Sequence, residues 1–200
     1  MNYNNLNITP MMDPQEINLI KKYLKPNDVM LEYGSGGSTL LFSQFVSEYY
    51  SIEHNHEWAV EVQNQIKDNV TYNVIDPKSG EVNDIFAGPP TLFKYKKGNI
   101  VQYDNIPHSW DKLKNSPYYN ELEKYITHPH TYNKIFDVVL VDGRARPECA
   151  QFIYDYIHND SILFIHDYFP RERYSCVLEK YDMVDSIQTT SQTIAVFKKK

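Results

Sequence analysis

Apolar residues recur along the chain in two alternating patterns, which together predict a sheet flanked by helices. Short apolar runs bounded by turn residues are typical of buried strands, whereas apolar residues three and four positions apart are typical of helices. The strand patterns are VMLEY, EYYSIEH, VTYNVID, KIFDVVLVDG and SILFIHDY, which begin at residues 29, 48, 70, 134 and 161. The helical patterns before and between them are PQEINLIKKYL, TLLFSQFV, EWAVEVQNQIK, PYYNELEKYI and PECAQFIYDYI. Strands that alternate with helices predict a parallel sheet covered on both faces.

The two ends of the chain add a helix start and a reversed strand. Asp13, Pro14 and Glu16 form a helix-start signal, with an acidic cap, proline at the first helical position and an acid in the first turn. After a further helical pattern, RERYSCVLEKY, the runs MVDSIQ and TIAVFKKK lie close enough to form an antiparallel hairpin. We therefore predict a Rossmann-like, doubly wound α/β fold with a seven-stranded, mostly parallel sheet and a C-terminal antiparallel hairpin strand.

The length and apolar content predict a single domain over residues 1–200. A chain of 200 residues with 42% hydrophobic residues is long enough to bury one sizeable core. Residues 77–132 break the alternating rhythm with GPP, KKGN and NIPHSW before one helical pattern appears. A segment of this length between two strands of a sheet is usually functional or poorly ordered. We interpret it as an insertion that forms a lid or part of an acceptor site.

Composition argues against two classes of partner. The net charge of −6 and the sequence pI of about 5.6 disfavour nucleic acid, whose binding proteins concentrate basic residues on one face. The sequence has no apolar run of membrane-spanning length and no signal-peptide pattern at its start. We therefore expect no membrane association and a cytoplasmic location, which for a viral chain means the host cytoplasm. Cys149 and Cys176 show no metal-ligand spacing, and we expect both to be reduced.

A polar residue closes each of the five predicted parallel strands. In a doubly wound sheet, ligands bind beyond the carboxyl ends of the strands, where the direction of winding reverses. Any single acid there could instead cap a helix. Polar residues at five strand ends together favour a ligand site, and they are Glu32, Glu53, His54, Asp76, Asp142, His166 and Asp167.

The glycine turn after the first strand favours a nucleoside ligand that carries no phosphate. Glycines at 34, 36 and 37 allow a sharp turn and close approach of a ligand, and Glu53 lies 21 residues after Glu32, the spacing at which a second-strand acid meets ribose hydroxyls. A dinucleotide site would have a third glycine where this chain has Thr39. A carboxylate at Glu32 repels phosphate and attracts an amino group or a sulfonium. S-adenosylmethionine (SAM) carries both of these cations.

Four motifs resemble those of class I SAM-dependent methyltransferases. They are LEYGSGGST, SIEHNHEW, FDVVLVDGRARPECA and ILFIHDYFPRERY. The pattern is most similar to a branch that includes polysaccharide-associated proteins and sugar O-methyltransferases of large algal viruses. The chain departs from the general acid-x-G-x-G-x-G pattern at Ser38, which stands at the last glycine position.

The resemblance implies roles for the residues of the first three strand ends. Glu32 and the turn would hold the methionine part of SAM, Glu53 the ribose hydroxyls, and His54 or Asp76 the region near adenine. The implied turn residues are Gly34, Ser35, Gly36, Gly37, Ser38 and Thr39.

The remaining strand ends predict the chemistry of transfer. A sugar hydroxyl needs either a general base or a metal that lowers its pKa. Asp142 and Asp167 could bind Mg or Mn through carboxylate oxygens, an arrangement similar to that of catechol-type O-methyltransferases. Alternatively, His166 or Asp167 acts as the base alone. A structural reading, with Asp142 as a helix cap and His166 tied into a hydrogen bond, is also open.

Arginines and aromatic residues near these strand ends predict the acceptor side. Guanidinium groups suit ligands rich in hydroxyls or carboxylates, and aromatic rings can stack on a sugar. The candidate substrate residues are Arg144, Arg146, Tyr168, Arg171, Arg173, His108 and Trp110. We predict a carbohydrate hydroxyl as acceptor, with small phenols, a non-catalytic nucleoside-binding module and a nucleotide-dependent oxidoreductase as alternatives. The oligomeric state, including a homodimer, is left open.

Overall fold

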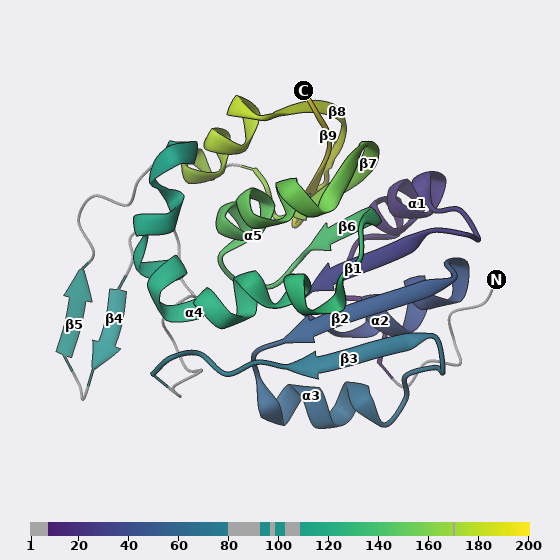
Figure 1. Ribbon diagram of the computed structural model, residues 1–200, viewed down its shortest axis with the longest axis horizontal. Helices are drawn as coiled ribbons and strands as arrows, with labels where there is room; N and C mark the ends of the chain where they lie inside the picture. The colour runs from purple at the N-terminus through teal and green to yellow at the C-terminus, as the bar shows by residue number, and fades with distance from the viewer. Residues whose placement is uncertain (1–7, 80–92, 97–98, 103–108, 170) are drawn as a thin grey trace.

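Seven strands form one mixed sheet in the computed structural model, which describes residues 8–79, 93–96, 99–102, 109–169 and 171–200 (Figure 1). The strand order is β3-β2-β1-β6-β7-β9-β8. The strands are β1 (Val29–Tyr33), β2 (Glu48–Glu53), β3 (Val70–Val74), β6 (Phe136–Val141), β7 (Ile157–His166), β8 (Tyr181–Gln188) and β9 (Thr193–Lys199). The first five are paired in parallel, and β9 runs antiparallel to both β7 and β8. The predicted fold, including its one reversed strand, is confirmed.

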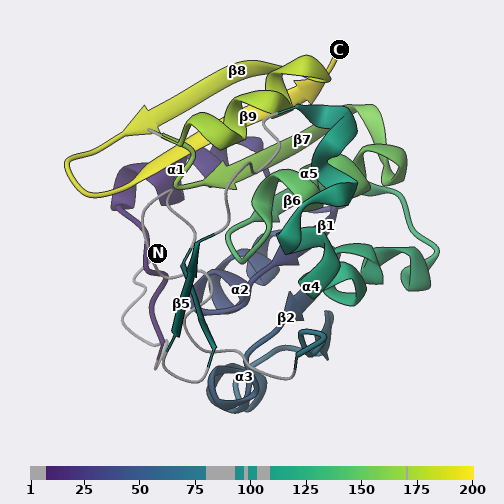
Figure 2. The same ribbon diagram turned by 90° about the vertical axis from the view of Figure 1, so that its left-hand side faces the viewer.

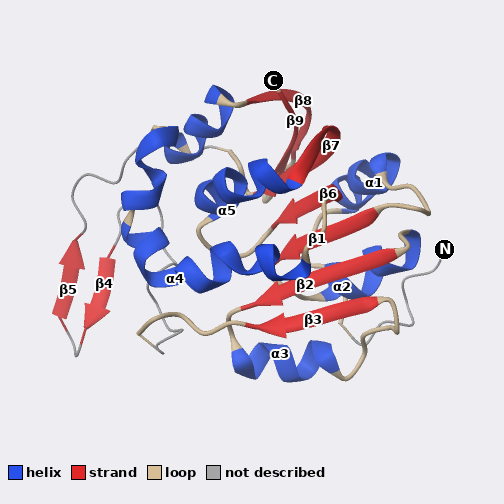
Figure 3. Cartoon of the chain, in the orientation of Figure 1, coloured by secondary structure: helices blue, strands red, loops and turns tan. Residues whose placement is uncertain are grey.

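Helices cover both faces of the sheet (Figures 1 and 3). The α-helices are α1 (Pro14–Tyr23), α2 (Gly37–Phe42), α3 (His56–Gln63), α4 (Pro117–Thr127) and α5 (Arg146–Ile153). Short 3-10 helices are η1 (Ser43–Phe45), η2 (Trp110–Asn115), η3 (His128–Tyr132), η4 (Tyr154–Tyr156) and η5 (Glu172–Glu179). The predicted α-helix RERYSCVLEKY is thus a 3-10 helix, and Ile157, predicted to end a helix, begins β7.

The alternation of side chains along β1 divides the core into two parts. Met30 packs with α1 and α2 on one face, whereas Leu31 and Tyr33 pack with α4, α5 and η5 on the other. Figure 2 shows these two helical layers on opposite sides of the strands. All three side chains are fully buried, as expected for strands covered on both faces.

The segment between β3 and β6 is only partly an insertion. Its helix α4 is the crossover that returns the chain from β3 to β6, and Tyr33 Oη donates a hydrogen bond to the Ile126 carbonyl at 2.7 Å, which joins α4 to β1. A small antiparallel sheet of β4 (Phe93–Lys96) and β5 (Asn99–Gln102) precedes it. Residues 80–92 and 103–108 lie outside the described residues, so the lid role stays a prediction.

The sheet order places a switch in winding between β1 and β6. The chain builds outward from β1 to β2 and β3, then returns to place β6 on the other side of β1. Adjacent loops at such a point leave the sheet toward opposite faces, which opens space for a ligand at the carboxyl ends.

Candidate active site

The turns after β1 and β6 touch at the switch point. Gly34 has φ +89°, a conformation that favours glycine, and a side chain there would come within 2.6 Å of the Gly143 backbone. Gly143 is constrained by its surroundings rather than by its φ, because an added Cβ would collide with the Tyr125 hydroxyl. Two glycines from different loops therefore allow the backbone contact that closes the base of the site.

Glu32 holds the glycine turn from beneath. Its carboxylate is fully buried and accepts hydrogen bonds from the hydroxyls of Ser38 (2.5 Å), Thr39 (2.5 Å) and Ser51 (2.9 Å), the last from its register partner on β2. Burial raises the pKa of the Glu32 carboxyl to about 7, although the hydroxyl donors oppose the rise. Glu32 thus faces the hydroxyls of the turn and of β2, and the predicted direct contact with a methionine group stays a prediction.

Glu53 joins the turn after β1 to the turn after β2. One carboxylate oxygen, Oε2, accepts from the backbone N–H and the hydroxyl of Ser35 at 2.8 and 3.0 Å. The other, Oε1, accepts from the backbone N–H groups of His54 and Asn55 at 2.8 and 2.9 Å. Burial alone would raise the pKa of Glu53, but the His54 side chain and these backbone donors outweigh it and leave the pKa below its ordinary value.

Gly36 and Gly37 have different surroundings. At Gly36 an added Cβ would meet only the Trp58 ring at 3.5 Å, and the Trp58 indole donates to the Ser35 carbonyl at 2.7 Å. At Gly37 an added Cβ would collide with the backbone of Thr9 and Pro10. The N-terminal segment of the chain therefore packs against Gly37, and a contact of this residue with a ligand stays a prediction.

The predicted adenine-side residues differ in burial. His54 is 8% exposed, and its ring lies 5.7 Å from the ring of Tyr125 in an edge-on arrangement. Its Nδ1 is 2.9 Å from Glu53 Oε1 but off the direction of a hydrogen bond. Asp76 is exposed and pairs with His56 at 2.6 Å. Of the two, only His54 is buried.

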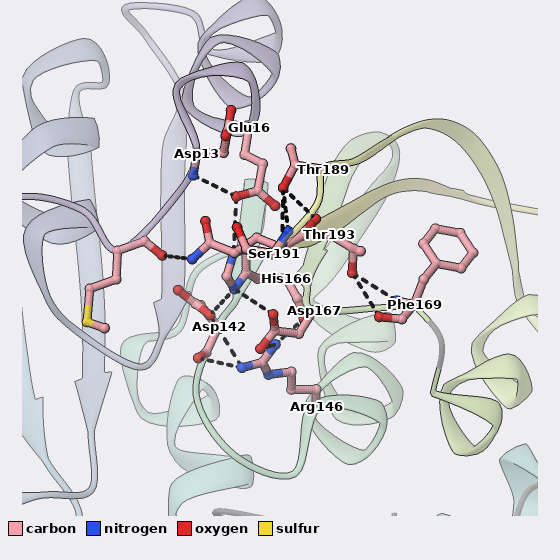
Figure 4. Close-up of polar contacts among 12 residues, drawn as sticks. Asp13, Glu16, Asp142, Arg146, His166, Asp167, Phe169, Thr189, Ser191 and Thr193 are labelled. Atoms are coloured by element: carbon pink, nitrogen blue, oxygen red, sulfur yellow. Dashed lines mark hydrogen bonds and ion pairs between the residues drawn. The ribbon is translucent and has the colours of Figure 1, made fainter. Parts of the chain in front are cut away.

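A second polar centre surrounds His166 at the end of β7 (Figure 4). His166 is 4% exposed, with Nδ1 2.8 Å from Asp142 Oδ1 and 3.8 Å from Asp167 Oδ1. On the other side of the ring, Nε2 lies 3.4 Å from Glu16 Oε2. Burial alone would lower the pKa of His166, but the carboxylates of Asp142, Glu16 and Asp167 overcome it and raise the pKa to about 9. The imidazole is therefore charged near neutral pH.

Arg146 binds the backbone and the two aspartates of this centre. Its guanidinium donates to the carbonyls of Gly143, Asp142 and His166, and lies 3.4 Å from Asp142 Oδ1 and 3.3 Å from Asp167 Oδ2. The side chain is only 7% exposed. The predicted substrate role of Arg146 is therefore corrected to a structural one, which fixes the carboxylates of β6 and β7 at their strand ends.

The predicted metal pair does not fit this geometry. Asp142 and Asp167 already face two cations, Arg146 and the charged His166, and a divalent ion between them would be repelled by both. Within the described residues, no group of three or more His, Cys, Asp or Glu side chains is arranged to hold a metal ion. The structure thus gives no support for Mg or Mn binding by Asp142 and Asp167.

The other predicted arginines occupy three different environments. Arg171 is 43% exposed and contacts Asp167 at 3.3 Å, so it borders the His166 centre. Arg173 is nearly buried, pairs with the buried Glu148 and lies 4.3 Å from the centre of the Tyr118 ring. Arg144 is half-buried in the loop after β6. Arg171 and Arg144 remain candidate substrate residues, whereas Arg173 belongs to the packing of η5 against α4 and α5.

The predicted aromatic contacts to a sugar lie in the core. Trp110 is 7% exposed and packs edge-on against Tyr154 and Tyr181. Tyr168 is 5% exposed and packs against Phe197. The Trp110 ring is therefore not free to stack on a sugar, and the ring of Tyr168, a predicted substrate residue, is likewise packed in the core. His108 lies outside the described residues.

Three residues of the site were not identified from the sequence. The sequence indicates Glu16 only as part of a helix start and assigns no role to Tyr125, one of 17 tyrosines. Trp58 closes the motif SIEHNHEW and lies at the start of a helical pattern, but the sequence assigns no role to it either. Their contacts cross between elements distant in the chain, and only the capping motif at Glu16 carried a local signal.

Comparisons with known proteins find a shared fold. No protein-family model and no curated protein matches the chain. A methyltransferase-like protein from Silicibacter pomeroyi is 23% identical, with a TM-score of 0.55, over 96% of this chain and 89% of that one. A putative methyltransferase from Streptococcus mutans in complex with SAH (S-adenosylhomocysteine) is 10% identical, with a TM-score of 0.54, over 96% of this chain and 100% of that one. A precorrin-8W decarboxylase from Methanobacterium thermoautotrophicum is 13% identical, with a TM-score of 0.53, over 96% and 92%.

These comparisons establish the Rossmann-like methyltransferase fold for this chain, and at such identities they establish the fold alone. No helix in the described part of the chain is long and apolar enough to cross a membrane.

Proposed function

We propose that this chain is a SAM-dependent O-methyltransferase that acts on a carbohydrate hydroxyl. One observation carries the proposal: the glycine turn after β1 is bound to Glu53 at the end of β2, directly beside the switch point of the sheet. An acid in this position of a doubly wound fold meets the hydroxyls of a ribose. The arrangement supports a ligand that contains a nucleoside.

The charges beneath the turn favour SAM over a dinucleotide. Glu53, whose pKa lies below its ordinary value, is ionised under the turn, and residues 34–39 contain no lysine or arginine. A pyrophosphate would meet this carboxylate without a balancing cation, whereas the amino group and sulfonium of SAM would be attracted. A nucleotide-dependent oxidoreductase is disfavoured for this reason.

The His166 centre would serve the acceptor. In methyl transfer the acceptor oxygen attacks the methyl carbon as its bond to sulfur breaks, so the enzyme must align the hydroxyl and remove its proton. The pKa of His166 is raised to about 9, so the ring is already protonated near neutral pH and is a poor acceptor for that proton. Asp142 and Asp167, with side chains 24% and 32% exposed, are the groups in the centre able to do so. We therefore assign the base to an aspartate and assign no step to a metal.

A carbohydrate acceptor suits the polar character of this centre. Carboxylates and the half-exposed Arg171 can bind several hydroxyls at once, while the aromatic rings of Trp110 and Tyr168 are occupied in the core. The resemblance of the motifs to sugar O-methyltransferases points the same way. A small phenol is the competing acceptor, and the turnover assay includes catechols for this reason.

Calorimetry and a turnover assay test the proposal. Titration with S-adenosylhomocysteine (SAH) should give a binding isotherm, NAD should give none, and Glu53→Ala should bind SAH at least tenfold more weakly. Methyl transfer from SAM should then be measured to a panel of mono- and oligosaccharides and to catechols. Tight NAD binding without SAH binding would overturn the donor assignment. Methylation of phenols alone would overturn the acceptor assignment.

A non-catalytic SAM-binding module is the second candidate. The observation in its favour is that Arg146 and His166 already neutralise both aspartates. It predicts SAH binding without turnover on any acceptor in the panel.

A further inference from the structure

Four donors already occupy the carboxylate that the proposed function assigns to ribose. A carboxylate has about four lone-pair sites. On Glu53, Oε1 accepts two backbone N–H groups, from His54 and Asn55, and Oε2 accepts the backbone N–H and the hydroxyl of Ser35. With its side chain 4% exposed, Glu53 has no free acceptor position for a ligand hydroxyl.

Only one of the four donors can leave without unfolding a turn. Three are backbone N–H groups whose positions are fixed by the two loops. The backbone at Ser35 is held further by the Trp58 indole, which donates to the Ser35 carbonyl at 2.7 Å. The fourth donor is the Ser35 hydroxyl, whose proton rotates freely about the C–O bond.

The Ser35 hydroxyl also has a second partner in place. Tyr72 Oη, from β3, lies 2.6 Å from Ser35 Oγ, and either oxygen can donate. The Ser35 hydroxyl can therefore turn its proton from Glu53 to Tyr72 without moving its oxygen, provided that Tyr72, which donates to Ser35 in the first arrangement, turns its own proton away. Glu53 Oε2 then has one donor fewer and can accept a hydrogen bond from a ligand hydroxyl, while Ser35 keeps its hydrogen bond to Tyr72.

We infer that the Ser35 hydroxyl occupies an acceptor position on Glu53 that a ribose hydroxyl takes when a nucleoside binds. Tyr72 then accepts the hydrogen bond of the Ser35 hydroxyl. Ser35 and Tyr72 then determine how readily the site accepts a ligand with a free ribose hydroxyl. This inference rests on the proposed function, because it takes Glu53 as the ribose-binding acid.

Calorimetric titration with SAH of four proteins tests the inference: wild type, Ser35→Ala, Tyr72→Phe and the double variant. Ser35→Ala removes the competing donor and should bind SAH about three- to tenfold more tightly, because the ligand hydroxyl no longer competes with Ser35 for Glu53 Oε2. Tyr72→Phe removes the alternative partner and should weaken binding about threefold. In the double variant the effect of Tyr72→Phe should disappear, because no Ser35 hydroxyl remains that could donate to Tyr72.

Ser47→Ala is the matched control. Ser47 directly precedes β2, and its hydroxyl donates to the Asn27 and Asp28 carbonyls just before β1, at the amino ends of both strands. Its loss should leave SAH affinity unchanged. Equal or weaker binding by Ser35→Ala, or a Tyr72 effect that persists without Ser35, overturns this inference while the proposed function stands. Absence of SAH binding by the wild type overturns both.

Discussion

Glu16 Oε2 lies 3.4 Å from His166 Nε2 and joins the first turn of α1 to the end of β7 across 150 residues of sequence. The same oxygen accepts the backbone N–H of Asp13 at 2.9 Å and completes the capping box of α1. The Glu16 side chain is fully buried, and its Oε1 atom has no hydrogen-bond partner. One carboxylate thus supports both the helix start and the charged imidazole (Figure 4).

Glu16→Gln should destabilise the protein by about 1–3 kcal/mol, because it removes the negative partner of a buried imidazolium and leaves the volume almost unchanged. Urea denaturation at neutral pH measures the change. Glu57→Gln is the control, since Glu57 also lies in the first turn of a helix but is exposed, and it should stay within about 0.5 kcal/mol of wild type. Equal effects of the two substitutions would contradict a specific role for Glu16.

Stability should fall between neutral and alkaline pH as His166 loses its proton. The pKa of His166 is raised from the ordinary 6.5 to about 9 in the folded protein. A raised pKa means that the stabilisation is complete below 6.5 and is lost as the pH rises through about 9, which amounts to about 3 kcal/mol at most.

This loss should be seen as a lower free energy of unfolding at about pH 9.5 than at about pH 6, and it should be reduced in His166→Gln. An NMR titration of the His166 ring in the wild-type protein is an independent measurement. A ring that titrates below pH 7 would show that Glu16, Asp142 and Asp167 do not hold the proton.

Gly143→Ala should destabilise the protein by about 1–3 kcal/mol, because the added methyl group would collide with the Tyr125 hydroxyl. Tyr125→Phe alone should have a small effect, since that hydroxyl is buried without a hydrogen-bond partner. In the double variant part of the Gly143→Ala cost should be recovered; the recovery should be incomplete, as the new Cβ would still lie 3.0 Å from the Gly34 nitrogen. Additive effects in this double-mutant cycle would rule out the contact.

Chelation should leave the activity unchanged. Arg146 and His166 occupy the cation positions beside Asp142 and Asp167, so excess EDTA should alter neither SAH affinity nor methyl transfer. Asp167→Asn, by contrast, should lower turnover about 10²–10⁴-fold if it removes the proton acceptor, with little effect on SAH binding. Loss of activity in EDTA, followed by recovery on addition of Mg or Mn, would support a role for a metal ion and contradict this prediction.

The sequence by itself determined the order of elements and the position of the candidate site. Apolar runs and helical spacings predicted each of the seven strands, and the short link before the final strand predicted that it would be reversed. These features follow from local patterns, because burial on both faces of a strand or on one face of a helix fixes where apolar residues must stand. Strand-end acids and the glycine turn located the site for the same reason, since parallel strands bring their carboxyl ends to one edge.

Only the tertiary structure decided what each polar side chain contacts. Arg146, Trp110 and Tyr168 looked available to a substrate, yet they pack into the protein, and Gly37 makes room for the N-terminal segment. Glu16 looked like a helix cap, yet it also contacts His166. Such roles depend on which segments meet across the fold and on how much water each pairing excludes, and no local spacing of residues encodes either.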